Sequence, residues 1–204
     1  VAIGDTDAFT SVRAAFTIGD TLYTAHSNGT LRARTFDGST LGPERTIDLH
    51  GLSSFANDLA SMRAMSYVNG RLYYTRGQST LYMRYFSTES EIVGATRFSV
   101  AGNSGNVSYT NLRNMAVIGD HVYYSTTSGP LQRASWTAGG GIQPNTSVQV
   151  SGSNADGLSW QDPFWVRQAQ APNQPPTVSA TGSCTGMLCT FEATASDADG
   201  TVTE

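Results

Sequence analysis

The sequence predicts an all-β fold: a β-propeller-like array of four-stranded antiparallel blades with a repeat of about 50 residues, followed by a partial β-sandwich. Equivalent residues recur along the chain at a 50-residue spacing without a gap. Within each repeat, short runs of alternating apolar and polar residues are separated by turns rich in Gly, Asn and Ser. No window shows the 3.6-residue period of an amphipathic helix, so we expect strands throughout.

The repeat is clearest at three arginines, Arg13, Arg63 and Arg113, each of which opens an apolar run. A turn signal and a second run rich in Leu, Val and Tyr follow in every copy. The third run contains a leucine and leads to an aromatic residue, and a fourth alternating run ends the repeat. This pattern predicts four strands per blade, with blades at about 12–50, 62–100 and 112–150 and flanking strands at 1–4 and 163–167. An ordinary β-sandwich of meanders is the alternative.

Three blades are too few to close a propeller ring, because propellers typically contain at least four. The sequence leaves three explanations open. Further blades belong to a longer protein of which this chain is a fragment, another copy of the chain completes the ring, or the repeats form an open array. We favour the fragment.

A second domain is expected after the repeats. Residues 169–176 form a Pro-rich linker, since prolines favour an extended backbone and cannot donate to a strand ladder. Cys184 and Cys189 lie close together in a segment rich in Gly, Ser and Thr, which favours a local disulfide and a secreted protein. A zinc site is the alternative, but no histidine is near these cysteines in the sequence. No run approaches the ~18 apolar residues of a membrane-spanning helix, so we expect no membrane span.

The C-terminal residues resemble the opening of a PKD-type immunoglobulin-like β-sandwich, which is expected to occupy 177–204. The resemblance rests on the leading Asn-x-Pro-Pro-Thr, the Cys pair flanking the second strand and a Ser-Asp-x-Asp-Gly turn. It implies an extracellular spacer or adhesive module without catalysis. The preceding repeats are similar in style to those of secreted actinobacterial proteins that carry PKD domains, notably at 68–75 and 91–94.

The composition excludes several classes of function. The net charge is -4 and no Lys/Arg cluster is present, so the basic surface needed for nucleic-acid binding is missing. All 12 basic residues are Arg and none is Lys, which excludes mechanisms built on a lysine amine. No serine-hydrolase elbow, zinc-protease motif or dinucleotide loop is found. The sequence therefore leaves enzymatic activity undecided and favours none within this chain.

The candidate ligand-binding residues lie in the loops that enter the first strand of each blade, because these loops emerge on one face of a propeller. Each loop offers an aromatic ring, which stacks on sugar C–H groups, and an amide or carboxylate that bonds to hydroxyl groups. In the alternative interpretation, the rings fill the space between blades and Asp and Asn cap turns. The candidates, together with the repeated arginines, are Asp7, Phe9, Arg13, Asp58, Arg63, Asn106, Tyr109, Arg113, Asp156 and Trp160.

Two further site hypotheses concern charge. The repeated arginines are suited to bidentate binding of an anionic group, or alternatively to tying adjacent blades by pairing with Asp7 or Asp58. Asp197 and Asp199 resemble part of a calcium loop, although they supply too few ligands alone and Gly200 more simply permits a tight turn. No other cofactor is expected.

These features predict a secreted, non-catalytic module that binds glycans or adheres to a cell surface, with a carbohydrate as its partner. The first alternative is an accessory portion of a secreted polysaccharide-degrading enzyme. The second is a structural extracellular subunit that self-associates through unpaired blade edges.

Overall fold

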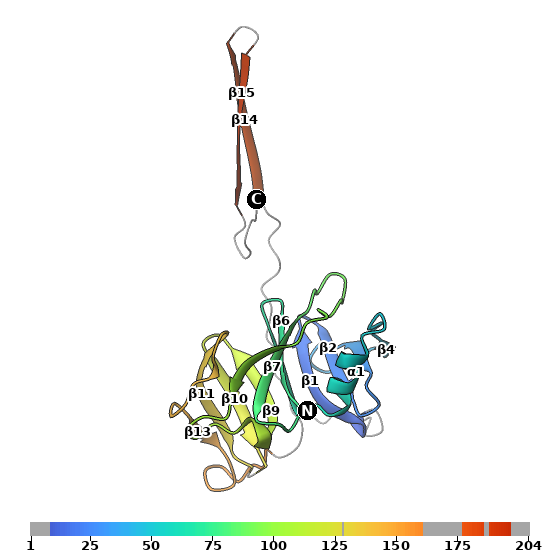
Figure 1. Ribbon diagram of the computed structural model, residues 1–204, viewed down its shortest axis with the longest axis vertical. Helices are drawn as coiled ribbons and strands as arrows, with labels where there is room; N and C mark the ends of the chain where they lie inside the picture. The colour runs from blue at the N-terminus through green and yellow to red at the C-terminus, as the bar shows by residue number, and fades with distance from the viewer. Residues whose placement is uncertain (1–8, 128, 161–176, 186–187, 197–204) are drawn as a thin grey trace. The chain divides into compact units, whose positions relative to one another are not determined.

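The computed structural model describes residues 9–127, 129–160, 177–185 and 188–196. The chain divides into two compact units, Val1–Gln168 and Ala169–Glu204. In the first unit, three antiparallel sheets follow one another along the chain and are coloured blue, green and yellow in Figure 1. We call them blades 1, 2 and 3. The predicted all-β, propeller-like fold is confirmed by these sheets.

Blades 1 and 2 each contain four strands in sequence order, and every neighbouring pair of strands is antiparallel. The strands of blade 1 are β1 (Val12–Ile18), β2 (Thr21–His26), β3 (Leu31–Thr35) and β4 (Arg45–Thr46). The strands of blade 2 are β5 (Ala64–Val68), β6 (Arg71–Thr75), β7 (Thr80–Tyr85) and β8 (Phe98–Gly102).

Blade 3 follows the same plan, with one variation at its outer edge. Its strands are β9 (Leu112–Ile118), β10 (His121–Thr126), β11 (Leu131–Thr137), β12 (Gly141–Ile142) and β13 (Val148–Ser151). Both β12 and β13 pair with β11, so two short strands share the fourth position. A 3-10 helix, η2 (Tyr109–Asn111), precedes β9.

The predicted hairpin turns are present between the first two strands of each blade. In blade 2, Asn69 and Gly70 connect β5 to β6 with φ angles of 44° and 75°. Positive φ at both positions is typical of a type I′ turn, whose twist matches that of the paired strands. In the Gly-Asp turns of blades 1 and 3 only the glycine has a positive φ, 54° at Gly19 and 60° at Gly119, as in a type II′ turn.

One element was not predicted. Residues 55–61 were expected to be a loop, but they belong largely to helix α1 (Ser53–Ala60), which contacts β2 and is drawn beside it in Figure 1. Phe55 and Leu59 lie one turn apart and are fully buried, so they anchor the helix in the core shared by blades 1 and 2. An eight-residue helix with two such anchors is too short to show its period in a sequence window.

The first strands of the blades lie at the centre of the unit. Strand β1 contacts β5, and β5 contacts β9. A cavity of about 30 Å³ is lined by residues of all three strands, as expected for the axis of a propeller. The chain therefore curls around its innermost strands, which brings their starting ends, and the arginines located there, to the same side.

Aromatic rings fill the space between neighbouring blades. Phe86, which immediately follows β7, packs edge-on against Phe16 and Tyr23 of blade 1, with ring centroids 5.9 and 5.5 Å apart. Trp136 in β11 packs edge-on against Tyr73 of blade 2 at 5.0 Å. Because edge-to-face pairs add to ordinary apolar burial, these residues tie each blade to the preceding one.

The second unit contains a hairpin of β14 (Thr177–Thr185) and β15 (Leu188–Ser196). The predicted disulfide between Cys184 and Cys189 is confirmed. The cysteines were expected to flank one strand. Instead each lies in a different strand of the hairpin, and the two face each other with Cα atoms 4.0 Å apart. A single hairpin does not test the resemblance to a PKD sandwich.

Several predicted features lie outside the described residues. They are the flanking strands at 1–4 and 163–167, the linker at 169–176, Asp7 and the calcium candidates Asp197 and Asp199.

Candidate functional site

A pocket of about 160 Å³ lies where blade 1 meets blade 2, and three arginines line it. Arg13 comes from β1, Arg63 immediately precedes β5, and Arg76 immediately follows β6. Among the described residues, the rest of the lining consists of Ala60, Ser61 and Met62, so no acidic side chain of this part of the chain lines the pocket. We call this site the arginine pocket. It offers many N–H donors to a ligand, whereas the Ser61 hydroxyl is engaged with Arg76 and with the backbone carbonyl groups of Asn57 and Asp58.

The arginine pocket combines free and fixed guanidinium groups. Arg13 and Arg63 are exposed, and within the described residues their side chains make no ion pair. Arg63 lies against Gly77, where an added Cβ would be 3.3 Å from its Nε atom. Gly77 has a φ of 71°, so glycine suits this position for both its backbone and its lack of a side chain. The Arg63 side chain thus has room beside Arg76.

Arg76 is held in place from behind by Asp58 of α1. Its Nη1 atom lies 2.9 Å from Asp58 Oδ1, and its Nε–H donates to Ser61 Oγ at 3.0 Å. The Arg76 side chain is 22% exposed, so it contacts the buried carboxylate and still reaches the pocket. A guanidinium group fixed in this way loses less conformational entropy when it binds a ligand.

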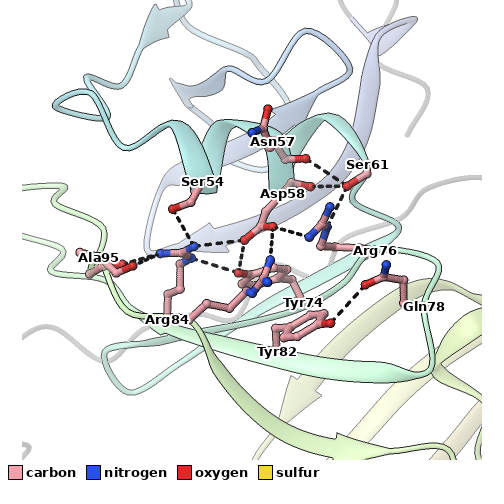
Figure 2. Close-up of polar contacts among 12 residues, drawn as sticks. Ser54, Asn57, Asp58, Ser61, Tyr74, Arg76, Gln78, Tyr82, Arg84 and Ala95 are labelled. Carbon is pink, nitrogen blue, oxygen red and sulfur yellow. Dashed lines mark hydrogen bonds and ion pairs between the residues drawn. The ribbon is translucent and has the colours of Figure 1, made fainter.

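Asp58 is fully buried and receives more than this one arginine, as Figure 2 shows. Arg97 donates to Oδ1 at 2.7 Å, while Arg84 and the Tyr74 hydroxyl donate to Oδ2 at 3.3 and 2.6 Å. A buried carboxylate needs such partners, because an unpaired charge in the interior is strongly unfavourable. We call Asp58, Tyr74, Arg76, Arg84 and Arg97 the Asp58 cluster.

Arg84 is as buried as Asp58, and each of its nitrogens has an acceptor. Nε–H donates to the Tyr74 oxygen at 3.0 Å, Nη2 donates to Ser54 Oγ, and Nη1 donates to the carbonyl groups of Gly94 and Ala95. Its guanidinium group also lies 5.4 Å from the centre of the Phe55 ring. Every nitrogen of the buried Arg84 guanidinium group is therefore hydrogen-bonded inside the protein.

Burial, reinforced by the hydrogen bond to Asp58, raises the pKa of Tyr74 well above its ordinary value of 10. The Tyr74 hydroxyl therefore stays protonated and keeps donating to the carboxylate. The Asp58 cluster then contains three positive groups and one negative group. With Arg13 and Arg63 nearby, the region has a strong local excess of positive charge in a chain whose net charge is -4.

The structure brings some of the predicted site residues together and separates others. Arg13 and Arg63 line one pocket, whereas the exposed Arg113 is not among its lining residues. The blade-tying interpretation expected Asp58 to pair with one of the repeated arginines. Asp58 instead pairs with three other arginines, which follow it in blade 2. Because Asp58 is fully buried, it acts on the pocket through Arg76 and does not face a ligand.

The remaining candidates have local structural contacts. Tyr109 lies in the core between blades 2 and 3, and its oxygen accepts the Ile142 backbone N–H at 3.0 Å. Phe9 packs on the apolar cluster at the far face of blade 1, and the Trp160 indole N–H donates to Ser151. The exposed Asn106 and Asp156 accept backbone N–H groups of nearby loops. The buried Tyr109 ring is out of reach of a ligand.

Sequence reasoning missed Arg76, Tyr74, Arg84 and Arg97. A usable signal was present at Arg84, because a charged residue at an inward position of an alternating strand needs a buried partner. Arg76 also stands out among the repeats, since His26 and Thr126 occupy the equivalent positions. Nothing in the sequence placed α1, and without this helix the contact between Asp58 and Arg76 was not foreseeable.

Among the residues that the structure describes, no group of three or more His, Cys, Asp or Glu side chains is arranged to hold a metal ion. In the same part of the chain, no helix is long and apolar enough to cross a membrane.

Comparison with known proteins gives no family. No family model matches the sequence, and no curated protein matches it. Solved structures with a similar arrangement include a WD40 β-propeller domain of Doa1, with a TM-score of 0.37 and 14% identity over 68% of this chain and 42% of that one. They also include a glutaminyl cyclase from Myxococcus xanthus, with a TM-score of 0.40 and 10% identity over 63% of this chain and 50% of the cyclase.

A computationally designed protein, Ika4, is similar over a larger share of both chains. The match covers 95% of this chain and 94% of Ika4, with a TM-score of 0.34 and 11% identity. The aligned region spans about half the length of the glutaminyl cyclase. Likenesses this weak transfer no activity, so the propeller-like description rests on the strand order and pairing of the chain itself.

Proposed function

We propose that this chain is a secreted, non-catalytic carbohydrate-binding module and that the arginine pocket is its binding site. The observation that carries the proposal is the pocket itself: three guanidinium groups line it, and no acidic side chain of the described residues does. A guanidinium group offers five N–H donors in a fixed plane, which suits a ligand whose surface consists of oxygen atoms. Sugars are ligands of this kind.

One further observation supports the proposal, and a second limits the size of the ligand. The disulfide in the second unit agrees with an oxidising, extracellular location, where such bonds persist. The pocket, at about 160 Å³, is smaller than the 300–1,000 Å³ typical of sites that enclose a whole small molecule. It therefore fits one sugar residue or one substituent of a longer chain that continues along the surface.

A glycan array probed with the full chain tests this function. We expect binding to a subset of glycans, loss of that signal in an Arg13→Gln/Arg63→Gln double variant, and retention in Arg113→Gln. Arg113 is the matched control because it occupies the same repeat position and is exposed, but does not line the pocket. An array on which no glycan retains the chain would overturn the proposal.

The same preparation separates the two alternatives. Release of reducing sugar from a bound polysaccharide would favour the alternative in which the chain is part of a polysaccharide-degrading enzyme. Growth of particle mass with protein concentration, measured by light scattering in the absence of a glycan, would support a self-assembling subunit.

A further inference from the structure

The arginine pocket has the composition of an anion-binding site, which accepts a narrower range of ligands than a general sugar-binding site. Its three charged lining residues all carry the same sign, and neither Arg13 nor Arg63 is neutralised by an ion pair within the described residues. Sites for neutral sugars combine donors with carboxylate or amide acceptors, because each hydroxyl group both donates and accepts. The lining residues here supply guanidinium donors almost exclusively.

The carboxylate of Asp58 does not cancel this charge. It is fully buried and its two oxygens are occupied by Tyr74, Arg76, Arg84 and Arg97. Counting only the arginines that contact it, three positive groups surround one negative group. The excess charge faces outward through Arg76 and Arg97, whose side chains are 22% and 36% exposed.

We infer that the arginine pocket binds a carboxylate or sulfate group of an acidic polysaccharide, with Arg13 and Arg63 as ligand contacts and Arg76 as the preorganised centre of the site. Arg–carboxylate and Arg–sulfate contacts are charge-assisted and can be bidentate, so they are stronger than contacts to a hydroxyl group. This inference rests on the proposed function and specifies its substrate class. Asp58 has the role of a positioning residue that fixes Arg76.

An acidic polysaccharide is favoured over a nucleic acid as the source of the anion. The pocket holds about one charged group, whereas nucleic-acid sites follow a row of phosphates along a positively charged groove. The net charge of -4 repels every polyanion outside the pocket, so the pocket size and not the net charge decides between the two. Binding to single-stranded DNA is therefore the alternative result that the experiment would detect.

The experiment uses affinity electrophoresis of the full chain in native gels that contain one polymer at a time. The polymer pairs differ only in charge: polygalacturonate against its fully methyl-esterified form, and dextran sulfate against dextran. The protein variants are Arg63→Gln and Arg13→Gln, with Arg113→Gln as the matched control. Inorganic sulfate alone and an oligo-dT strand, which a gel does not hold, are titrated against the same proteins by isothermal titration calorimetry.

We expect at least one acidic polymer to retard the chain while its uncharged form does not. Arg63→Gln and Arg13→Gln should each weaken that retardation about tenfold or more, because a charge-assisted contact is lost, and Arg113→Gln should leave it unchanged. Raising the salt concentration should weaken binding, as for any contact between exposed charges.

Each other outcome overturns a definite part of the inference. Equal retardation by the charged and uncharged polymers, unaffected by Arg63→Gln, would refute the anion site and leave the proposed glycan binding standing. Sulfate binding that Arg63→Gln removes, without binding of any polymer, would overturn both glycan assignments and leave a site for small anions. Tighter binding of oligo-dT than of every polysaccharide would make a nucleic acid, and not an acidic polysaccharide, the ligand of the pocket. Acidic polymers bound equally by Arg63→Gln and Arg113→Gln would place the contact outside this pocket.

Discussion

Blades 2 and 3 have the same frame but differ in their interior polar residues. Tyr74 and Tyr124 are separated by 50 residues, and each pairs with a methionine of the preceding strand, Met65 or Met115. In blade 2 the Tyr74 hydroxyl donates to a buried carboxylate. In blade 3 the Tyr124 hydroxyl contacts Ser147 Oγ at 2.7 Å and donates to the side-chain oxygen of Gln132 at 3.1 Å.

The difference extends to every charged member of the Asp58 cluster. The residues of blade 3 at the same repeat positions as Asp58, Arg76, Arg84 and Arg97 are Ser108, Thr126, Ala134 and Ser147. A blade of this type therefore folds with no buried charge at these positions. Since buried ion pairs contribute little net stability compared with well-packed apolar residues, stability alone does not account for the charges of blade 2, and Arg76 is the member of the cluster that reaches the pocket.

The largest expected effect comes from removing the charge that holds the Asp58 cluster together. Asp58→Asn should lower the free energy of unfolding by about 3–5 kcal/mol, because three arginines then lose their buried counter-charge. Ser108→Ala is the matched change in blade 3, and it should stay within about 0.5 kcal/mol because the Ser108 side chain makes no capping bond. Urea unfolding curves measure both, and similar losses in the two variants would contradict the difference between the blades.

A smaller effect is expected at the paired tyrosines. Tyr74→Phe leaves one oxygen of Asp58 and the Nε–H of Arg84 short of a partner in the interior, and should destabilise the protein by about 1.5–3 kcal/mol. Tyr124→Phe removes contacts to partners near the surface and should cost about 1 kcal/mol or less. Urea unfolding again supplies the values, and a larger loss for Tyr124→Phe would reverse the assignment.

Blade 1 extends the comparison through pH. His26 stands at the repeat position of Arg76, is buried, and contacts Ser11 Oγ and Thr24 Oγ1. Burial, followed by the charge of Arg32, lowers the pKa of His26 below its ordinary value of 6.5. As pH falls below about 6.5, the unfolded chain binds this proton before the folded chain does, so stability must decrease. It is retained in full above that pH.

This pH dependence is measured by urea unfolding at pH 7.5 and pH 5. His26→Gln should lose less stability over that interval than the wild type does. His50→Gln is the control, since His50 is exposed at the surface, and it should keep the slope of the wild type. Equal slopes in all three proteins would show that His26 does not contribute.

Much of the fold was predictable because it depends on local pattern. The 50-residue spacing, the Asn-Gly turn of blade 2 and the alternating strands indicate four-stranded units from the sequence alone. Helix α1 was not predictable in this way. Its eight residues are stabilised by the burial of Phe55 and Leu59 against strands of blade 1, which is a tertiary effect that a sequence window does not contain.

The candidate site was predicted only in part, for a related reason. Arg13 and Arg63 were identified by their repetition, and both line the arginine pocket. Arg113 shares the pattern but does not line the pocket, and Thr126 stands in blade 3 where Arg76 stands in blade 2. Repetition thus identified Arg13 and Arg63, whereas Arg76, which is not repeated, was missed.

The smallest expected effect concerns the exposed arginines themselves. Arg63→Gln and Arg113→Gln should each change the free energy of unfolding by no more than about 0.5 kcal/mol, because neither side chain is buried or ion-paired within the described residues. Urea unfolding of both variants beside the wild type makes the comparison direct. A loss above 1 kcal/mol for Arg63→Gln alone would make Arg63 a structural tie between blades 1 and 2. Weaker glycan binding by that variant would then report unfolding of the site and not loss of a ligand contact, so this measurement decides how the binding experiments are interpreted.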